Sequence, residues 1–290
     1  MGKTVKAWFG YWIKQVAGLI LRVLIPEVIG VFFINFLTGI ASYQLVGVTN
    51  TRDIALAYGF ITALMSYVLY PVSGAYLNSM RVICFMIDDR TLDTFLKSIG
   101  MLLQHLVGSI LSGVALKYTQ PESLSKNGLG YPKLGEDTTI AQGFFFEAIS
   151  SFFFMFVIVA VILFDKTLPG NRATIPSLSA AINLVIYSSI GMVGGVSVSM
   201  NPARTLGPAL FSEEGLFVRG WWIYYTANFL GGFLGYYFGI FMAEDKDSDI
   251  HSYKYRYTEA QMKEKGLRYQ ISAFEVSALR RMIGLQGLFE

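Results

Sequence analysis

The sequence predicts an all-α membrane protein with six transmembrane helices and two re-entrant half-helices, built as an inverted repeat. Three observations support this fold class. The 290-residue chain is 53% hydrophobic and only 15% charged, whereas soluble domains carry about a quarter charged residues. Its apolar residues fall in long blocks. Its two halves share a short sequence pattern, and each half contains a motif led by an asparagine.

The apolar blocks give the transmembrane spans in chain order. Each block is close to the roughly 20 residues that an α-helix needs to cross a bilayer. We expect spans at Leu19–Ile40, Ile54–Tyr70, Leu92–Leu116, Ala141–Phe164, Ile175–Val193 and Trp221–Met242. The half-helices are expected between spans, at Ser79–Ile87 and Pro202–Phe211.

The spans divide the chain into three regions. Residues 1–18 form a cytosolic N-terminal segment with an amphipathic pattern, which either lies on the membrane surface or covers the cytosolic mouth. Residues 19–242 form the membrane domain, and residues 243–290 form a cytosolic C-terminal tail. Both termini are placed in the cytosol because this orientation puts most of the 23 lysines and arginines on the inner side.

The composition argues against several classes of function. The membrane topology explains the basic residues behind the net charge of +3, so we expect no nucleic-acid partner. The single cysteine, Cys84, excludes an intramolecular disulfide. The two histidines, His105 and His251, lie far apart in the sequence, and we interpret His105 as a packed side chain on the third span rather than a metal ligand. Without a nucleophile–base pair or a phosphate loop in the sequence, we expect neither an enzyme nor a cofactor.

The two halves of the chain repeat each other. The ten residues from Glu27 match those from Glu147 at five positions, at an offset of 120, and Asn78 and Asn201 lie 123 residues apart. Three spans per half is an odd number, so the second half must insert upside down relative to the first. Inverted repeats whose broken helices meet at the membrane midplane are typical of transport proteins.

The second asparagine motif suits the start of a half-helix. Asn201 can cap the helix and still offer its amide group to a passing solute. Pro202 fits the first helical position, and Ala203 allows neighbouring helices to approach closely. Arg204 adds a fixed positive charge to the roughly +0.5 of an elementary charge at a helix N-terminus. Such a site would admit neutral hydrogen-bonding solutes and repel cations.

The first motif departs from this pattern after its asparagine. Asn78 is followed by Ser79, which lacks the preset backbone angle of proline, and by the bulky Met80. Arg81 is then the counterpart of Arg204 and a possible modulator of the pore. Arg81 either lines the lumen or extends toward the cytosolic mouth. We expect the second arrangement, hydrated or paired with a carboxylate or carbonyl, because a buried guanidinium is costly.

Glu27 and Glu147 occupy equivalent points in the first span of each half. An ionisable residue within a span can take part in transport, for example in a proton relay. A re-entrant loop, however, has backbone groups that need partners away from water. We therefore interpret both glutamates as hydrogen-bond acceptors that hold the two loops.

These motifs resemble those of the aquaporin, or major intrinsic protein, family. The resemblance covers about residues 20–242 and rests on the residues from Ala55 to Phe60, those from Pro71 to Asn78, and the Asn201-Pro202-Ala203-Arg204 motif. It implies the six-span fold and a homotetramer with one pore per subunit. It also assigns the narrowest filter of the pore to Tyr58, Ser189, Val198 and Arg204. Ser189 stands where strict water channels often have histidine, so this filter is expected to be wider.

The resemblance implies passive conduction of water through the bilayer, with small neutral solutes as further substrates. Three alternatives stay open. The first is a glycerol or mixed-solute channel in the same fold. The second is a poorly conducting scaffold or adhesion protein whose pore Met80 and Arg81 have closed. The third is a proton-coupled transporter that uses Glu27 and Glu147.

Overall fold

The structure is a computed structural model that describes residues 25–43, 51–88, 91–126, 128–135, 137–164, 184 and 198–243. Three predicted regions lie outside this set. They are the N-terminal segment 1–18, the tail from residue 244 onward, and the fifth span at Ile175–Val193 apart from Leu184.

Five long helices correspond to the first, second, third, fourth and sixth predicted spans. They are α2 (Ile25–Tyr43), α3 (Thr51–Ser73), α5 (Leu92–Thr119), α7 (Ile140–Phe164) and α10 (Ile223–Ala243). By length and composition, α2, α3, α5 and α7 are able to cross a membrane. Helix α10 has 21 residues, which is about the length of a membrane span.

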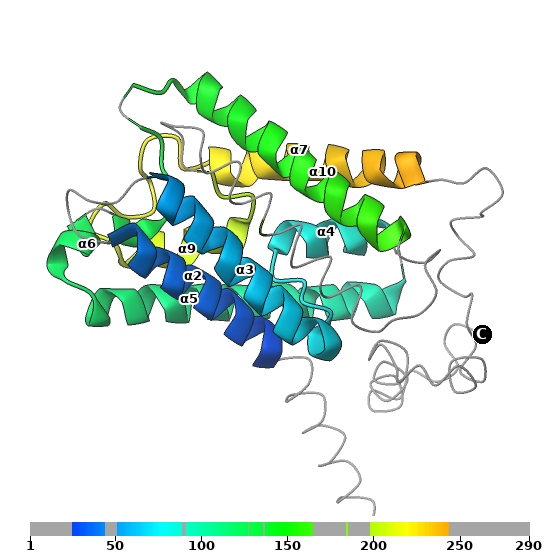
Figure 1. Ribbon diagram of the computed structural model, residues 1–290, viewed down its shortest axis with the longest axis horizontal. Helices are drawn as coiled ribbons and strands as arrows, with labels where there is room; N and C mark the ends of the chain where they lie inside the picture. The colour runs from blue at the N-terminus through cyan, green and yellow to red at the C-terminus, as the bar shows by residue number, and fades with distance from the viewer. Residues whose placement is uncertain are drawn as a thin grey trace, which may run out of the picture.

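Two short helices lie where the sequence predicts half-helices. Helix α4 (Ser79–Asp88) and helix α9 (Pro202–Phe211) have 10 residues each, about half the length of a membrane span. Figure 1 shows them end to end, between α2, α3 and α5 on one side and α7 and α10 on the other. A five-residue helix, α6 (Glu122–Lys126), and a 3₁₀ turn, η2 (Gly128–Gly130), lie in the connection between α5 and α7.

Small residues set the close helix contacts around the half-helices. A Cβ on Gly207 of α9 would collide with the carbonyl oxygen of Ser109 on α5. A Cβ on Gly231 of α10 would collide in the same way with the carbonyl of Ala148 on α7. Glycine therefore allows these backbones to approach directly, as is common between membrane helices.

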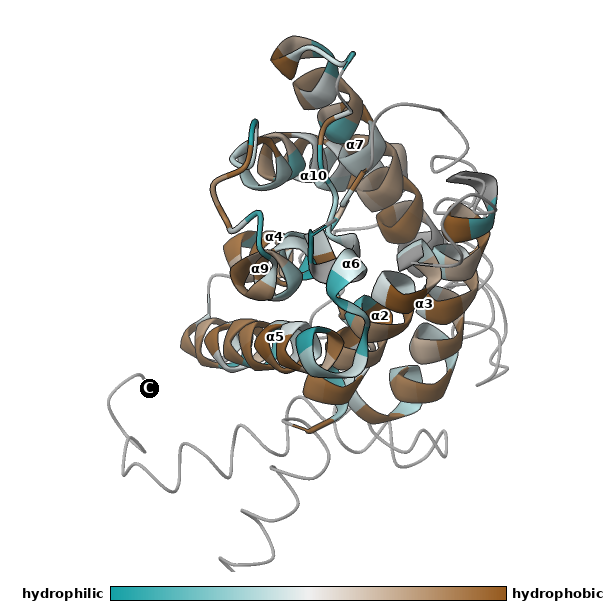
Figure 2. Ribbon diagram, turned by 90° about the vertical axis from the view of Figure 1, so that its left-hand side faces the viewer, coloured by the Kyte–Doolittle hydropathy of each residue, from teal (hydrophilic) through white to brown (hydrophobic). Residues whose placement is uncertain are grey.

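The distribution of polar residues is that of a membrane protein with a polar interior. Large apolar side chains such as Phe60, Phe145 and Ile149 point outward, with more than half of their surface exposed. Glu27 and Glu147, in contrast, are fully buried. Figure 2 shows hydrophobic residues along the long helices and hydrophilic residues gathered in the segment around α6. The polar groups that position the site thus face one another inside the bundle.

Candidate functional site

The two half-helices begin against each other through their motif asparagines. Asn78 Nδ2 donates to the carbonyl of Met200 at 2.6 Å, and Asn201 Nδ2 donates to the carbonyl of Leu77 at 2.7 Å. Each Oδ1 also caps its own helix, because it accepts from the backbone two residues later, at 2.9 Å in α4 and 3.1 Å in α9. Each amide keeps a second hydrogen that can point toward a solute.

The departures in the first motif have specific partners. Ser79, unlike proline, has a backbone N–H, which donates to Asn201 Oδ1 at 3.3 Å. Its hydroxyl lies 3.2 Å from Nδ1 of His105 on α5. The Met80 side chain is buried and packs over Gly232 of α10, where a Cβ would lie 2.6 Å from Met80 Cγ. The bulk of Met80 is therefore accommodated by a glycine on the neighbouring helix.

Side chains of α2 and α5 form hydrogen bonds with the backbone of the second half-helix. The carbonyl of Ala203 accepts from Asn35 Nδ2 at 2.9 Å and from Ser109 Oγ at 2.5 Å. The Ser109 hydroxyl also accepts from the backbone N–H of Gly207 at 2.8 Å. Pro202 lies at the first helical position, as expected for a residue without an N–H. The sequence analysis did not identify Asn35 and Ser109, although polar residues within apolar spans are a signal for such roles.

Glu27 binds the backbone of the first loop. Its two carboxylate oxygens accept from the N–H of Tyr76 at 3.0 Å and the N–H of Leu77 at 2.7 Å. The Ser73 hydroxyl donates to Oε1 at 2.5 Å. His105 Nε2 lies 3.0 Å from Oε2, and both of these side chains are fully buried. His105 is thus more than packing, since it joins Glu27 to Ser79.

Glu147 binds the second loop in the equivalent way. It accepts from the N–H of Ser199 at 2.8 Å and the N–H of Met200 at 2.7 Å. Its third donor is Asn228 of α10, whose Nδ2 lies 3.0 Å from Oε1. Each loop is therefore held by its own glutamate, which also contacts Ser73 and His105 in the first half and Asn228 in the second.

Three of the four predicted filter residues come together in the structure. The Arg204 guanidinium carbon lies 4.1 Å from the centre of the Tyr58 ring, a cation–π contact. Arg204 Nη1 donates to the carbonyl of Val198. The Tyr58 hydroxyl donates to the carbonyl of Ser199 at 3.2 Å. The fourth predicted residue, Ser189, lies outside the described part of the chain.

Arg81 contacts a backbone carbonyl and a tyrosine ring. Its Nη1 donates to the carbonyl of Ala75 at 2.9 Å, and its guanidinium carbon lies 4.8 Å from the centre of the Tyr76 ring. A carbonyl partner was among the expected ones, but the side chain lines the cavity between the half-helices and the long helices. The backbone carbonyl and the ring stabilise the guanidinium charge there, and its extension toward the cytosolic mouth stays a prediction.

Polar and apolar side chains both line the cavity. The polar ones include Tyr58, Thr62 and Ser66, which recur every four residues on α3. Thr62 is 5% exposed, and its hydroxyl has no partner among the described residues. The sequence analysis missed Thr62 and Ser66, although their helical spacing from Tyr58 was a usable signal.

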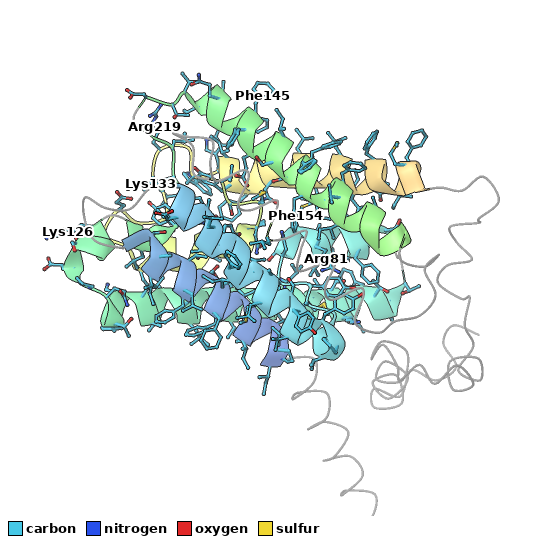
Figure 3. All side chains as sticks on the ribbon, viewed as in Figure 1. Arg81, Lys126, Lys133, Phe145, Phe154 and Arg219 are labelled. Atoms are coloured by element: carbon cyan, nitrogen blue, oxygen red, sulfur yellow. The ribbon has the colours of Figure 1, made fainter. Side chains whose placement is uncertain are left out.

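The cavity is also lined by the apolar side chains of Ile34, Phe154 and Ile158. Arg81 of α4 and Phe154 of α7, both cavity-lining residues, are labelled in Figure 3. The volume of the cavity that the centre of a water-sized sphere can occupy is about 10 Å³. This volume is near the minimum that holds one ordered water. The described cavity is therefore about large enough for one water molecule.

Comparisons with known proteins agree with this architecture. A model of the major intrinsic protein family matches residues 13–238. Glycerol uptake facilitator protein-like 6 of Lactiplantibacillus plantarum is 30% identical over 220 residues, which cover 74% of this chain and 94% of that protein. A probable NIP-type aquaporin of Nicotiana alata is 29% identical over 236 residues, which cover 79% of this chain and 80% of that protein.

A solved structure shows the same fold. The X-ray structure of the aquaglyceroporin from Plasmodium falciparum aligns with a TM-score of 0.61 and 19% identity, over 78% of this chain and 97% of that chain. The predicted all-α fold with half-helices is thereby confirmed. Because the family match extends through both asparagine motifs, the chain belongs to the major intrinsic protein family of integral membrane channels.

Proposed function

We propose that the protein is a passive channel for water that also admits small neutral solutes. The observation that carries this proposal is the paired arrangement of Asn78 and Asn201, both of which line a small cavity. Each asparagine uses one amide hydrogen to fix the opposite loop and keeps one for a passing molecule. Water would then cross in single file, oriented at the midplane by both amides.

The charges at the site support the exclusion of cations. The N-termini of α4 and α9 meet at the asparagines, so their partial positive charges add at that point. Arg204 adds a full charge next to Tyr58. A cation would lose its hydration and meet only positive potential, whereas water meets hydrogen-bond donors.

Glycerol or a similar polyol is the second candidate substrate. Thr62 lines the cavity together with the apolar Phe154 and Ile158, and its hydroxyl has no partner among the described residues. A polyol has hydroxyl groups along one edge and C–H groups along the other, which fits such a mixed lining. One relative is named as a glycerol uptake facilitator-like protein, and the small Ser189 of the predicted filter is consistent with a wider opening.

The contacts of Met80 and of the two glutamates bear on the scaffold and on the proton-coupled transporter. Met80 packs on Gly232, which supports an open pore over a scaffold that Met80 has closed. Glu27 and Glu147 are fully buried and accept hydrogen bonds from the loops, which supports acceptor roles over a proton relay. Cytosolic termini and a homotetramer remain part of the proposal, on the basis of the lysine and arginine distribution and the family resemblance.

The direct test is a stopped-flow comparison of water and glycerol fluxes in proteoliposomes. Liposomes that contain the wild-type protein should shrink faster than protein-free liposomes after an osmotic step. Thr62→Val, which keeps the side-chain shape and removes the hydroxyl, should lower the ratio of glycerol flux to water flux. Wild-type proteoliposomes that behave like empty ones, with the protein shown to be folded, would reject the channel in favour of the scaffold.

A further inference from the structure

The arginines of the two half-helices occupy equivalent positions. Arg81 and Arg204 each follow a motif asparagine by three residues. Each donates through Nη1 to a carbonyl six residues earlier, Ala75 for the first and Val198 for the second. The repeat therefore preserves a specific backbone contact and not merely a residue type.

Each arginine also contacts a tyrosine ring, although the two tyrosines are not equivalent in the repeat, because Tyr58 lies on α3 and Tyr76 lies in the loop before α4. The Arg204 guanidinium carbon lies 4.1 Å from the ring centre of Tyr58, and that of Arg81 lies 4.8 Å from the ring centre of Tyr76. In each half an arginine is thus held between a carbonyl and the face of a tyrosine. Both arrangements hold a guanidinium group in place.

The loop that presents the Ala75 carbonyl is itself held in place. Ala75 and Leu77 have left-handed backbone angles, with φ of 45° and 51°. The Ser73 hydroxyl accepts from the N–H of Ala75 at 3.2 Å and donates to Glu27. Such angles persist in residues other than glycine when surrounding contacts impose them. The carbonyl that anchors Arg81 is therefore part of a built site.

Arg81 places a positive charge at the wall of the cavity. Arg81 is the one ionised side chain among the described residues that line the cavity, and no described carboxylate forms an ion pair with it. Because α4 and α9 begin against each other and extend apart (Figure 1), Arg81 lies on the other side of the asparagines from Arg204. A cation entering from either end would meet a fixed positive charge in a site with little water.

We propose that Arg81 is a specificity-determining residue that forms a second cation barrier, on the opposite side of Asn78 and Asn201 from the Arg204 filter. This inference rests on the proposed channel function. Two barriers, one at Arg81 and one at Arg204, would then exclude cations independently of each other. Removing either arginine leaves one barrier in place, and removing both opens a continuous path. Protons are the most sensitive probe, because they can move along a file of water without a wider pore.

The test compares wild-type protein with Arg81→Met, Arg204→Met and the double variant in proteoliposomes at equal protein density. Water flux is measured by stopped flow, and proton leak by a trapped pH-sensitive dye under an imposed potassium diffusion potential. Each single variant should leak protons within about twofold of wild type, and the double variant about tenfold faster, a factor equivalent to about 1.4 kcal/mol. Lys117→Met, which removes an exposed cation on α5, is the matched control.

Two results would overturn the second barrier. One is a proton leak through Arg204→Met alone that equals that of the double variant. The other is a double variant that conducts water and stays as proton-tight as wild type. Water flux of the wild-type protein reports separately on the channel proposal, so a failure of that proposal appears as absent flux in every sample.

A second measurement covers the case in which Arg204→Met does not fold. Cys84 is the single cysteine of the chain, so Arg81→Cys in a Cys84→Ala background leaves one thiol, at the proposed barrier. Mercuric ion bound there should block most of the water flux, and a reducing thiol should restore it. Complete labelling of this cysteine without loss of flux would show that position 81 is outside the path and would overturn the proposal.

Discussion

Asn78 and Asn201 each donate a hydrogen bond to the carbonyl of the residue that precedes the other. The amide of Asn78 binds Met200, and that of Asn201 binds Leu77. The residues joined by these two bonds are 122 and 124 positions apart in the chain. The bonds therefore hold the two loops together at one point. This exchange sets the spacing and the orientation of both half-helices.

Shortening either asparagine should reveal its two separate contributions. We expect Asn201→Ala to lower the free energy of unfolding by about 1–3 kcal/mol, because both the helix cap and the bond to Leu77 are lost. Asn201→Ser should be less destabilising, since serine still caps the helix but does not reach the opposite loop. Thermal unfolding in detergent compares the two, and equal losses would contradict this division of roles.

The buried glutamates should tolerate glutamine far better than leucine. Glu147→Gln keeps an acceptor oxygen for the loop, whereas Glu147→Leu leaves the N–H groups of Ser199 and Met200 without partners. We expect a loss of about 1–2 kcal/mol for glutamine and about 3 kcal/mol or more for leucine. The same order is expected for Glu27. Detergent-solubilised yield and unfolding temperature provide the measurement, and leucine variants as stable as glutamine variants would count against the acceptor role.

Ser79 and His105 should be coupled in stability. Their side chains lie 3.2 Å apart, and His105 also contacts Glu27. A double-mutant cycle with Ser79→Ala and His105→Ala should give an interaction free energy of about 0.5–2 kcal/mol. As a control, the cycle of Ser79→Ala with Asn228→Ala, which lies in the other half of the repeat, should be close to additive. Additivity in the Ser79–His105 cycle would show that their contact contributes nothing.

Met80 should contribute to stability rather than close the pore. Because the side chain is buried against Gly232, we expect Met80→Ala to lower the free energy of unfolding by about 2–4 kcal/mol. Water flux per folded molecule should not increase. A large rise in flux in stopped-flow measurements would instead identify Met80 as an obstruction and revive the scaffold interpretation of the wild-type protein.

The sequence predicted the framework of the site because each part of it has a local signal. Apolar blocks located the spans, and the expected start and end of the second half-helix, at Pro202 and Phe211, agree with α9. The repeat of Glu27 and Glu147 identified the carboxylates that lie against the loops. These features depend on hydrophobicity, capping and internal symmetry, all of which a single sequence displays.

The partners of those residues depend on tertiary packing and were harder to predict. His105 had no local feature linking it to Glu27, because the contact joins α5 to α2. The direction of Arg81 was set by the Ala75 carbonyl, whose position follows from left-handed backbone angles at residues other than glycine. Solvation arguments gave a carbonyl as one expected partner of Arg81, but they could not say which carbonyl the fold would supply. The filter role of Ser189 stays a prediction.

The temperature dependence of water flux through the purified wild-type protein in proteoliposomes tests the central claim most directly. Water that passes the paired asparagines does not enter the hydrocarbon, so its flux should exceed that of protein-free liposomes and rise less steeply on warming. Flux with the same magnitude and the same temperature dependence as the bare bilayer, from protein shown to be folded, would contradict a conducting path between the two half-helices.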